Sequence, residues 1–255
     1  MDVYVPQLIL FLLLFARITS MIVVAPVFGH LTIPLQVKAA LGLFLSFVLF
    51  PMVSATGPQV DVPMMALVVM ALQEIATGAL IGFAAGLMFA GIRYAGEIVS
   101  LHMGLSFANI LDPDTNQNNP VIGQFLYLTT ILIFLTINGH HFLIEALYLS
   151  YSGVPLGTFT FAPSVSHELI RMVGMVFVVG VKFAAPVLVA IFLNNIAMGI
   201  LARVMPQMNI FSISFSLNIG VGLLVLMTTA PLVVYVFKKA LAGFEQNVLE
   251  LIKLM

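Results

Sequence analysis

The sequence predicts an all-α integral membrane protein with about six long, partly kinked hydrophobic helices. Hydrophobic residues make up 62% of the 255 positions and charged residues only 7%, whereas about 25% of the residues in ordinary soluble domains are charged. Six apolar runs lie near the ~20 residues that a helix needs to cross a bilayer. So few charges cannot cover a soluble protein of this size, and much of the exterior must face lipid or other apolar protein.

The apolar runs are joined by short segments rich in turn residues, which predicts a single membrane-embedded domain over residues 1–255. Pro186 and Pro231 lie inside the last two runs, where each removes a helix hydrogen bond and favours a kink. The first residues lack the basic stretch of a cleavable signal peptide, so we expect the first run to remain as a helix. The runs cover residues 8–27, 37–53, 64–92, 121–137, 169–201 and 213–237.

Four ionisable residues interrupt these runs or adjoin them. Arg17 lies near the middle of the first run, where a cation costs about 2.5–3.5 kcal/mol on insertion scales, so we expect it to face another helix, a partner or water. Glu74, Glu97 and Lys182 are compatible with an ion path or an inter-subunit salt bridge. They are equally compatible with helices that extend beyond the hydrocarbon, or with a lysine that reaches its edge.

Gly78, Gly82 and Gly86 recur every four residues in the third run. This spacing puts them on one helix face, where missing side chains permit close approach of a second backbone. We therefore expect helix packing there, against this chain or a neighbouring subunit.

Several classes of function are excluded or unsupported. The chain has no cysteine, which excludes disulfides and zinc–thiolate sites. Its net charge of −1 gives no basic patch for nucleic acid. His141 and Glu145 have metal-ligand spacing but no evident third ligand, and no nucleophile or phosphate-binding motif is present. We predict no enzyme, no metal and no cofactor.

Three blocks carry a resemblance to a known family. The central block is Gly96-Glu97-Ile98, His102-Met103-Gly104-Leu105-Ser106-Phe107-Ala108 and Asp112-Pro113. The next is Asn138-Gly139-His140, and the last is Arg203-Val204-Met205-Pro206-Gln207-Met208-Asn209. Together, in this order and spacing, they resemble the flagellar biosynthetic protein FliR family, whose injectisome equivalent belongs to the same family. The central block is more similar to the flagellar branch.

The resemblance implies a conduit and not a catalyst. Members of this family form one strand of a helical rosette with FliP and FliQ subunits, and FlhB associates with its outside. Unfolded export substrates cross the bacterial inner membrane through this gate in the flagellar basal body. The resemblance further implies one copy of this chain in each gate, and a rosette that projects towards the periplasm.

The resemblance also implies roles for individual residues. The loop of residues 106–121 would hang into the pore and help to close it, with Phe107 and Ile110 as its apolar face. A plain helix connector is the alternative. The expected plug residues are Ser106, Phe107, Ala108, Asn109, Ile110, Leu111, Asp112 and Pro113. The expected inter-subunit or inter-helix polar contacts are made by Arg17, Glu97, Arg203, Gln207 and Asn209.

Two other functions fit the composition. A secondary transporter would also be hydrophobic, with kinked helices and sparse buried charges, but it would show two related halves, which are not evident here. A structural membrane scaffold differs from a gate only in that no substrate passes through it.

Overall fold

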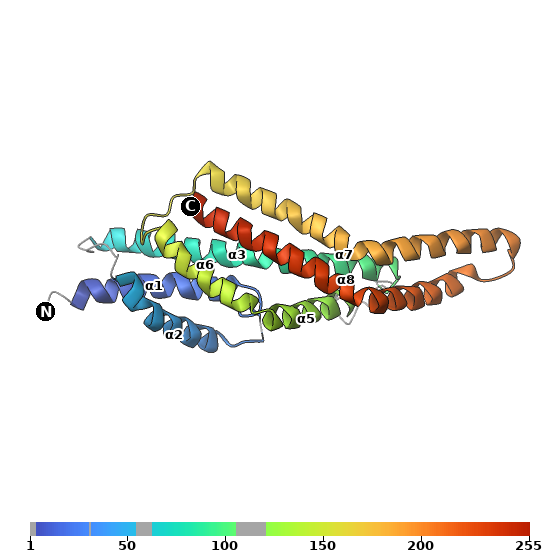
Figure 1. Cartoon of the computed structure of the whole chain (residues 1–255), viewed down its shortest axis with the longest axis horizontal. Coiled ribbons are helices and arrows are strands. Elements are labelled where there is room, and N and C mark those ends of the chain that lie inside the picture. Colours follow the sequence, from blue (N-terminus) through green and yellow to red (C-terminus); the bar gives the residue numbers. More distant parts are fainter. Residues whose placement is uncertain (1–3, 31, 55–62, 106–120) are drawn as a thin grey trace. The chain divides into compact units, whose positions relative to one another are not determined.

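The computed structural model describes residues 4–30, 32–54, 63–105 and 121–255, and every regular element within these ranges is a helix (Figure 1). The helices are α1 (Tyr4–Val24), α2 (Leu35–Ser54), α3 (Met64–His102), α5 (Val121–Thr136), α6 (Gly139–Gly153), α7 (Pro163–Val204) and α8 (Ile210–Leu254). The prediction of an all-α membrane protein is confirmed.

Most of these helices can cross a membrane by length and composition. Five qualify alone, and α5 with α6 qualifies as a broken pair, which gives up to six spans in the described part of the chain. Each predicted apolar run falls on one of these elements. Three helices are much longer than their predicted runs: α3 has 39 residues, α7 has 42 and α8 has 45. Pro186 and Pro231 lie inside α7 and α8, as expected.

Helix α1 has one clearly buried face. Its buried residues recur three and four positions apart, as the 3.6-residue helical repeat requires. They include Leu10, Leu13, Leu14, Arg17, Ile18, Met21 and Ile22. Helix α2 packs against α1, and Figure 1 shows the two side by side in blue. The rings of Phe11 and Phe50 meet edge to face across this contact, with centroids 5.8 Å apart. The polar member of the buried face, Arg17, therefore lies within the core.

The chain divides into two compact units. The first comprises Met1–Leu87, Phe134–Val173 and Gly243–Met255, and the second comprises Met88–Ile133 and Gly174–Ala242. The first unit therefore contains α1, α2, α6 and one end each of α3, α7 and α8. The second contains most of α5 and the remaining parts of α3, α7 and α8. The expectation of a single domain stays a prediction.

Close backbone approach and aromatic contacts hold the second unit together. A Cβ atom on Gly91 would lie 3.0 Å from the Val176 carbonyl oxygen, and one on Gly180 would lie 2.6 Å from the Tyr94 ring. Helices α3 and α7 thus pack through glycines. The ring of Phe89 on α3 meets Tyr127 on α5 edge to face at 6.2 Å. It meets Phe237 on α8 at 6.4 Å. Helices α3, α5 and α8 thus share an aromatic cluster around Phe89, and α7 packs against α3 through the glycines.

Candidate functional site: a buried ion pair, a glycine face and the exposed hairpin of α7 and α8

The most deeply buried charges of the first unit form a bidentate pair between α1 and α3. Arg17 Nε donates to Glu74 Oε2 at 2.6 Å, and Arg17 Nη2 donates to Glu74 Oε1 at 3.1 Å. Neither side chain has any exposed surface. Two parallel hydrogen bonds match the planar guanidinium to the carboxylate, which is the strongest form of such a pair.

The remaining guanidinium group of Arg17 holds the C-terminal end of α6. Arg17 Nη1 donates to the carbonyl oxygens of Ser150 at 3.1 Å and Val154 at 3.0 Å. The guanidinium carbon lies 4.6 Å from the centre of the Tyr151 ring, a cation–π contact. The Ser150 carbonyl also accepts from the Val154 amide at 2.8 Å. The cation thus adds a second donor at the C-terminal end of α6, where a positive charge is favourable.

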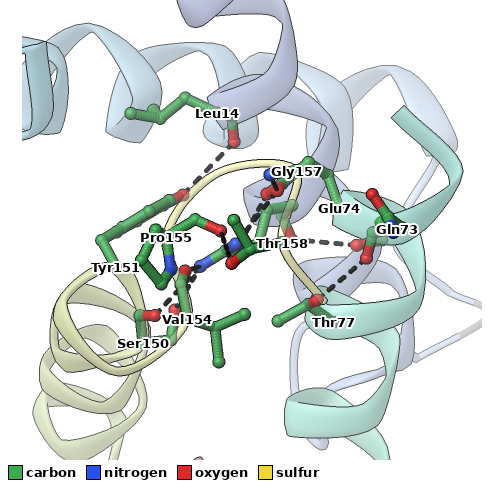
Figure 2. Close-up of polar contacts among 12 residues, drawn as sticks. Leu14, Gln73, Glu74, Thr77, Ser150, Tyr151, Val154, Pro155, Gly157 and Thr158 are labelled. Atoms are coloured by element: carbon green, nitrogen blue, oxygen red, sulfur yellow. Dashed lines mark hydrogen bonds and ion pairs between the residues drawn. The ribbon is translucent and has the colours of Figure 1, made fainter. Parts of the chain in front are cut away.

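The same carboxylate holds the connection between α6 and α7. The Gly157 amide donates to Glu74 Oε1 at 2.8 Å, and Gln73 Nε2 donates to the Phe159 carbonyl at 3.0 Å. Gly157 has a φ of +72°, and a Cβ there would collide with the side chain of Met70, so the position requires glycine. Figure 2 shows Gly157 and Glu74 joined by this bond, with Ser150 and Val154 of the α6 end nearby. One ion pair therefore ties together α1, α3 and the segment that follows α6.

Two of the three stripe glycines lie against α1. A Cβ on Gly78 would collide with the Arg17 carbonyl oxygen and with Ser20 Oγ. One on Gly82 would lie 2.7 Å from the Met21 carbonyl oxygen. Nothing lies within 4 Å of a Cβ on Gly86. The close approach needed to form the ion pair thus depends on Gly78 and Gly82 and does not extend to Gly86.

The expected polar contacts other than Arg17 lie on the surface. Glu97, Arg203 and Gln207 are exposed and make no hydrogen bond or ion pair with another described residue. Asn209 Oδ1 accepts from the Ser212 amide at 3.4 Å. This is the N-cap arrangement at the start of α8.

The expected plug residues 106–113 lie outside the described residues, whereas the helices that flank them are described. A Cβ on Gly96 of α3 would collide with the Cα of Gly123 on α5. Met103, near the end of α3, is fully buried and lies against Gly222 of α8, where a Cβ would be 2.8 Å from its side chain. Helices α3 and α5 therefore touch backbone to backbone close to where the chain leaves and re-enters the described structure.

One polar group on the hairpin of α7 and α8 was missed by the sequence analysis. Asn194 Nδ2 donates to Asn218 Oδ1 at 2.7 Å, and Asn218 Nδ2 donates to Asn195 Oδ1 at 3.2 Å. The three amides form a chain of hydrogen bonds between the two helices. Adjacent asparagines inside an apolar run were the available signal. Their spatial partner lies 24 positions on from Asn194 and cannot be found by spacing.

Large apolar side chains surround this polar group. Within the second unit, exposed large apolar residues occur on α7 from Phe177 to Val204 and on α8 from Phe211 to Tyr235, and Lys182 is an exposed charge among those of α7. Only 6% of the most apolar stretch of α8 is buried. No group of three or more His, Asp or Glu that could hold a metal ion is present among the described residues.

Known proteins are similar to this chain in sequence over most of its length. The model of the family "Bacterial export proteins, family 1" matches residues 8–244. Flagellar biosynthetic protein FliR of Bacillus subtilis (strain 168) is 31% identical over 236 residues, covering 89% of this chain and 88% of that protein. FliR of Escherichia coli (strain K12) is 33% identical over 219 residues, covering 85% and 82%. FliR of Pectobacterium carotovorum subsp. carotovorum is 36% identical over 223 residues, covering 86% and 83%. With its apolar helices and a match over nearly its whole length, the chain belongs to family 1 of the bacterial export proteins, the family of the flagellar biosynthetic proteins FliR.

Proposed function

We propose that the chain is a core subunit of a flagellar type III protein-export gate in the bacterial inner membrane. In this proposal it assembles with FliP and FliQ subunits, with one copy of this chain in each gate, and FlhB binds the outside. Unfolded export substrates pass through the assembly, part of which projects towards the periplasm. The names of the relatives support a role in flagellar biosynthesis and bacterial export.

The observation that carries the assembly is the length of the exposed apolar surface. Exposed apolar residues recur along α7 from Ile170 to Val204, about 50 Å at 1.5 Å per residue, and Arg171 and Lys182 are exposed charges among them. The hydrocarbon core of a bilayer is only ~30 Å thick. If the helix tilts by about 40°, the upper end of the usual range, the hydrocarbon core covers about 40 Å of its length. Lipid therefore leaves part of this surface uncovered, and other protein subunits are the remaining apolar cover.

The proposed plug is the segment of residues 106–121, in which the apolar side chains of Phe107 and Ile110 would close the pore. Apolar side chains that converge in a narrow passage expel water and so block ions, and they separate without breaking strong bonds. The backbone contact between Gly96 and Gly123 supports the proposal, because it brings the helices flanking this segment together at fixed positions.

The assembly is tested by co-expressing this chain with FliP and FliQ subunits and weighing the purified complex by native mass spectrometry. We expect a stable hetero-oligomer with one copy of this chain. A monomer or homodimer that ignores those partners would contradict the proposal and favour a transporter.

Closure is tested by measuring ion leak through the assembled complex in cells or liposomes. Phe107→Ser with Ile110→Ser should raise the leak, because the closure loses its apolar contact. The matched control, Asn116→Ser with Asn118→Ser, changes the polar part of the same segment and should leave the leak unchanged. An unchanged leak in both variants, with the complex intact, would indicate a scaffold.

A further inference from the structure

The asparagine chain of the α7–α8 hairpin has unused hydrogen-bonding capacity. A neutral amide offers two N–H donors and a carbonyl oxygen with two lone pairs. Asn195 uses its oxygen for Asn218 and makes no other hydrogen bond with a described residue. It is exposed, whereas Asn194 and Asn218 are partly buried in the hairpin. The exposed end of the chain is thus an amide with both donors available.

Lipid is a poor cover for this amide. Asn195 lies within α7, whose composition is that of a membrane span, and N–H groups without an acceptor are unfavourable in a fully apolar medium. Water is also a poor match, because the neighbouring residues Phe192, Leu193 and Ile196 are large, apolar and exposed. A surface of this kind is covered by a protein helix that is apolar and carries a polar side chain at the level of the asparagine.

We propose that Asn195 hydrogen-bonds an asparagine or glutamine side chain on an apolar helix of a partner subunit and thereby fixes the register of that helix on the α7–α8 hairpin. An amide is the fitting partner because its oxygen accepts from the free N–H groups of Asn195. Its own N–H group can donate to the second lone pair of the Asn195 oxygen. A single buried asparagine is known to set register and partner choice between apolar helices in the same way. The inference rests on the proposed function, since it needs a partner subunit, and it adds the chemistry by which that partner is positioned.

The first test is copurification of FliP and FliQ subunits with the full-length chain. Asn195→Leu keeps the bulk of the side chain and leaves the Asn194–Asn218 bond in place. We expect roughly a three- to tenfold loss of copurified partner, as for other polar contacts between membrane helices, and recovery with Asn195→Gln. The matched control is Thr228→Val on α8. The Thr228 hydroxyl already donates to the carbonyls of its own helix, so this variant should copurify normally.

The second test uses the absence of cysteine from the chain. A nitroxide on Asn195→Cys would be its only spin label, and cysteine-free partner subunits keep it so. In the assembled complex we expect low collision rates with both oxygen and a water-soluble nickel chelate, because protein covers the site. In the isolated chain one of the two rates should be high.

The outcomes separate this inference from the proposed function. Failure of the wild-type chain to copurify with FliP and FliQ would overturn both. Normal copurification of wild type and of Asn195→Leu alike would overturn the asparagine contact alone. A label in the complex that collides freely with oxygen would show lipid at Asn195, and one that collides freely with the chelate would show water. Either result overturns the inference and leaves the assembly standing.

Discussion

Arg17 and Glu74 face each other across α1 and α3 with their Nε and Oε2 atoms 2.6 Å apart, and neither side chain has exposed surface. Removing one member of such a pair leaves an uncompensated buried charge. We therefore expect Glu74→Ala to lower the free energy of unfolding by about 3–5 kcal/mol. Chemical unfolding of the purified chain in detergent measures the loss.

The double variant Arg17→Met with Glu74→Leu is the control for charge. It fills similar volume and leaves no unpaired ion, so it should recover most of the lost stability. If the double variant were as unstable as Glu74→Ala, the hydrogen bonds from Arg17 to Ser150 and Val154, and not the charge balance, would dominate this site.

The glycine face of α3 gives a matched pair of substitutions. Gly78→Ala puts a methyl group against the Arg17 carbonyl of α1, and backbone cannot yield as a flexible side chain can. We expect a loss of about 1–3 kcal/mol in the same unfolding measurement. Gly86→Ala meets nothing within 4 Å and should be neutral or gain up to about 1 kcal/mol from helix propensity. Equal effects at the two positions would argue against the close approach of α1 and α3.

A second glycine pair tests the flanks of the proposed plug. Gly96→Ala forces α3 away from Gly123 of α5, whereas Gly174→Ala on α7 meets nothing within 4 Å. In cells that depend on this chain, we expect swimming to fall sharply with Gly96→Ala and to persist with Gly174→Ala. Immunoblots of membranes establish that both variants are present. Normal swimming with Gly96→Ala would mean that the spacing of these two helices does not matter for export.

A substitution at Arg203 tests the stability of the chain and its assembly with partners separately. It is exposed in the last turn of α7 and pairs with no described residue, so Arg203→Ala should change the unfolding free energy by no more than about 0.5–1 kcal/mol. If its role is to contact a neighbouring subunit, copurification with FliP and FliQ should nevertheless fall. A large loss of stability in the isolated chain would instead place its partner within this chain.

The class of fold and the positions of the spans could be predicted because they follow from composition along the chain. The ends of the helices could not. Helix α3 runs on past Arg93 and Glu97 to His102, because α-helices continue through charged residues that lie at their surface. Helix α6 was not predicted as a separate element. Its buried Leu143, Ala146 and Leu147 recur at helical spacing, which was a usable signal.

The site was less predictable, because its contacts join distant parts of the chain. Arg17 and Glu74 were each recognised as exceptions to the apolar pattern, yet nothing in their sequence context indicates that they pair across 57 positions. The glycine stripe predicted a packing face without saying what covers it. In the fold, α1 lies against Gly78 and nothing lies within 4 Å of a Cβ on Gly86. Glu97, Arg203 and Gln207 are compatible with contacts to other subunits, which a single chain does not contain.

The mismatch between the apolar length of α7 and the thickness of a bilayer has a consequence for the living cell. A newly made copy without partner subunits exposes apolar surface, because the bilayer cannot cover the whole apolar length of α7. Chaperones and membrane proteases act on proteins that expose apolar surface of this kind. Its abundance should therefore follow the supply of the proposed partner subunits, and surplus copies should be degraded even when their gene is strongly expressed.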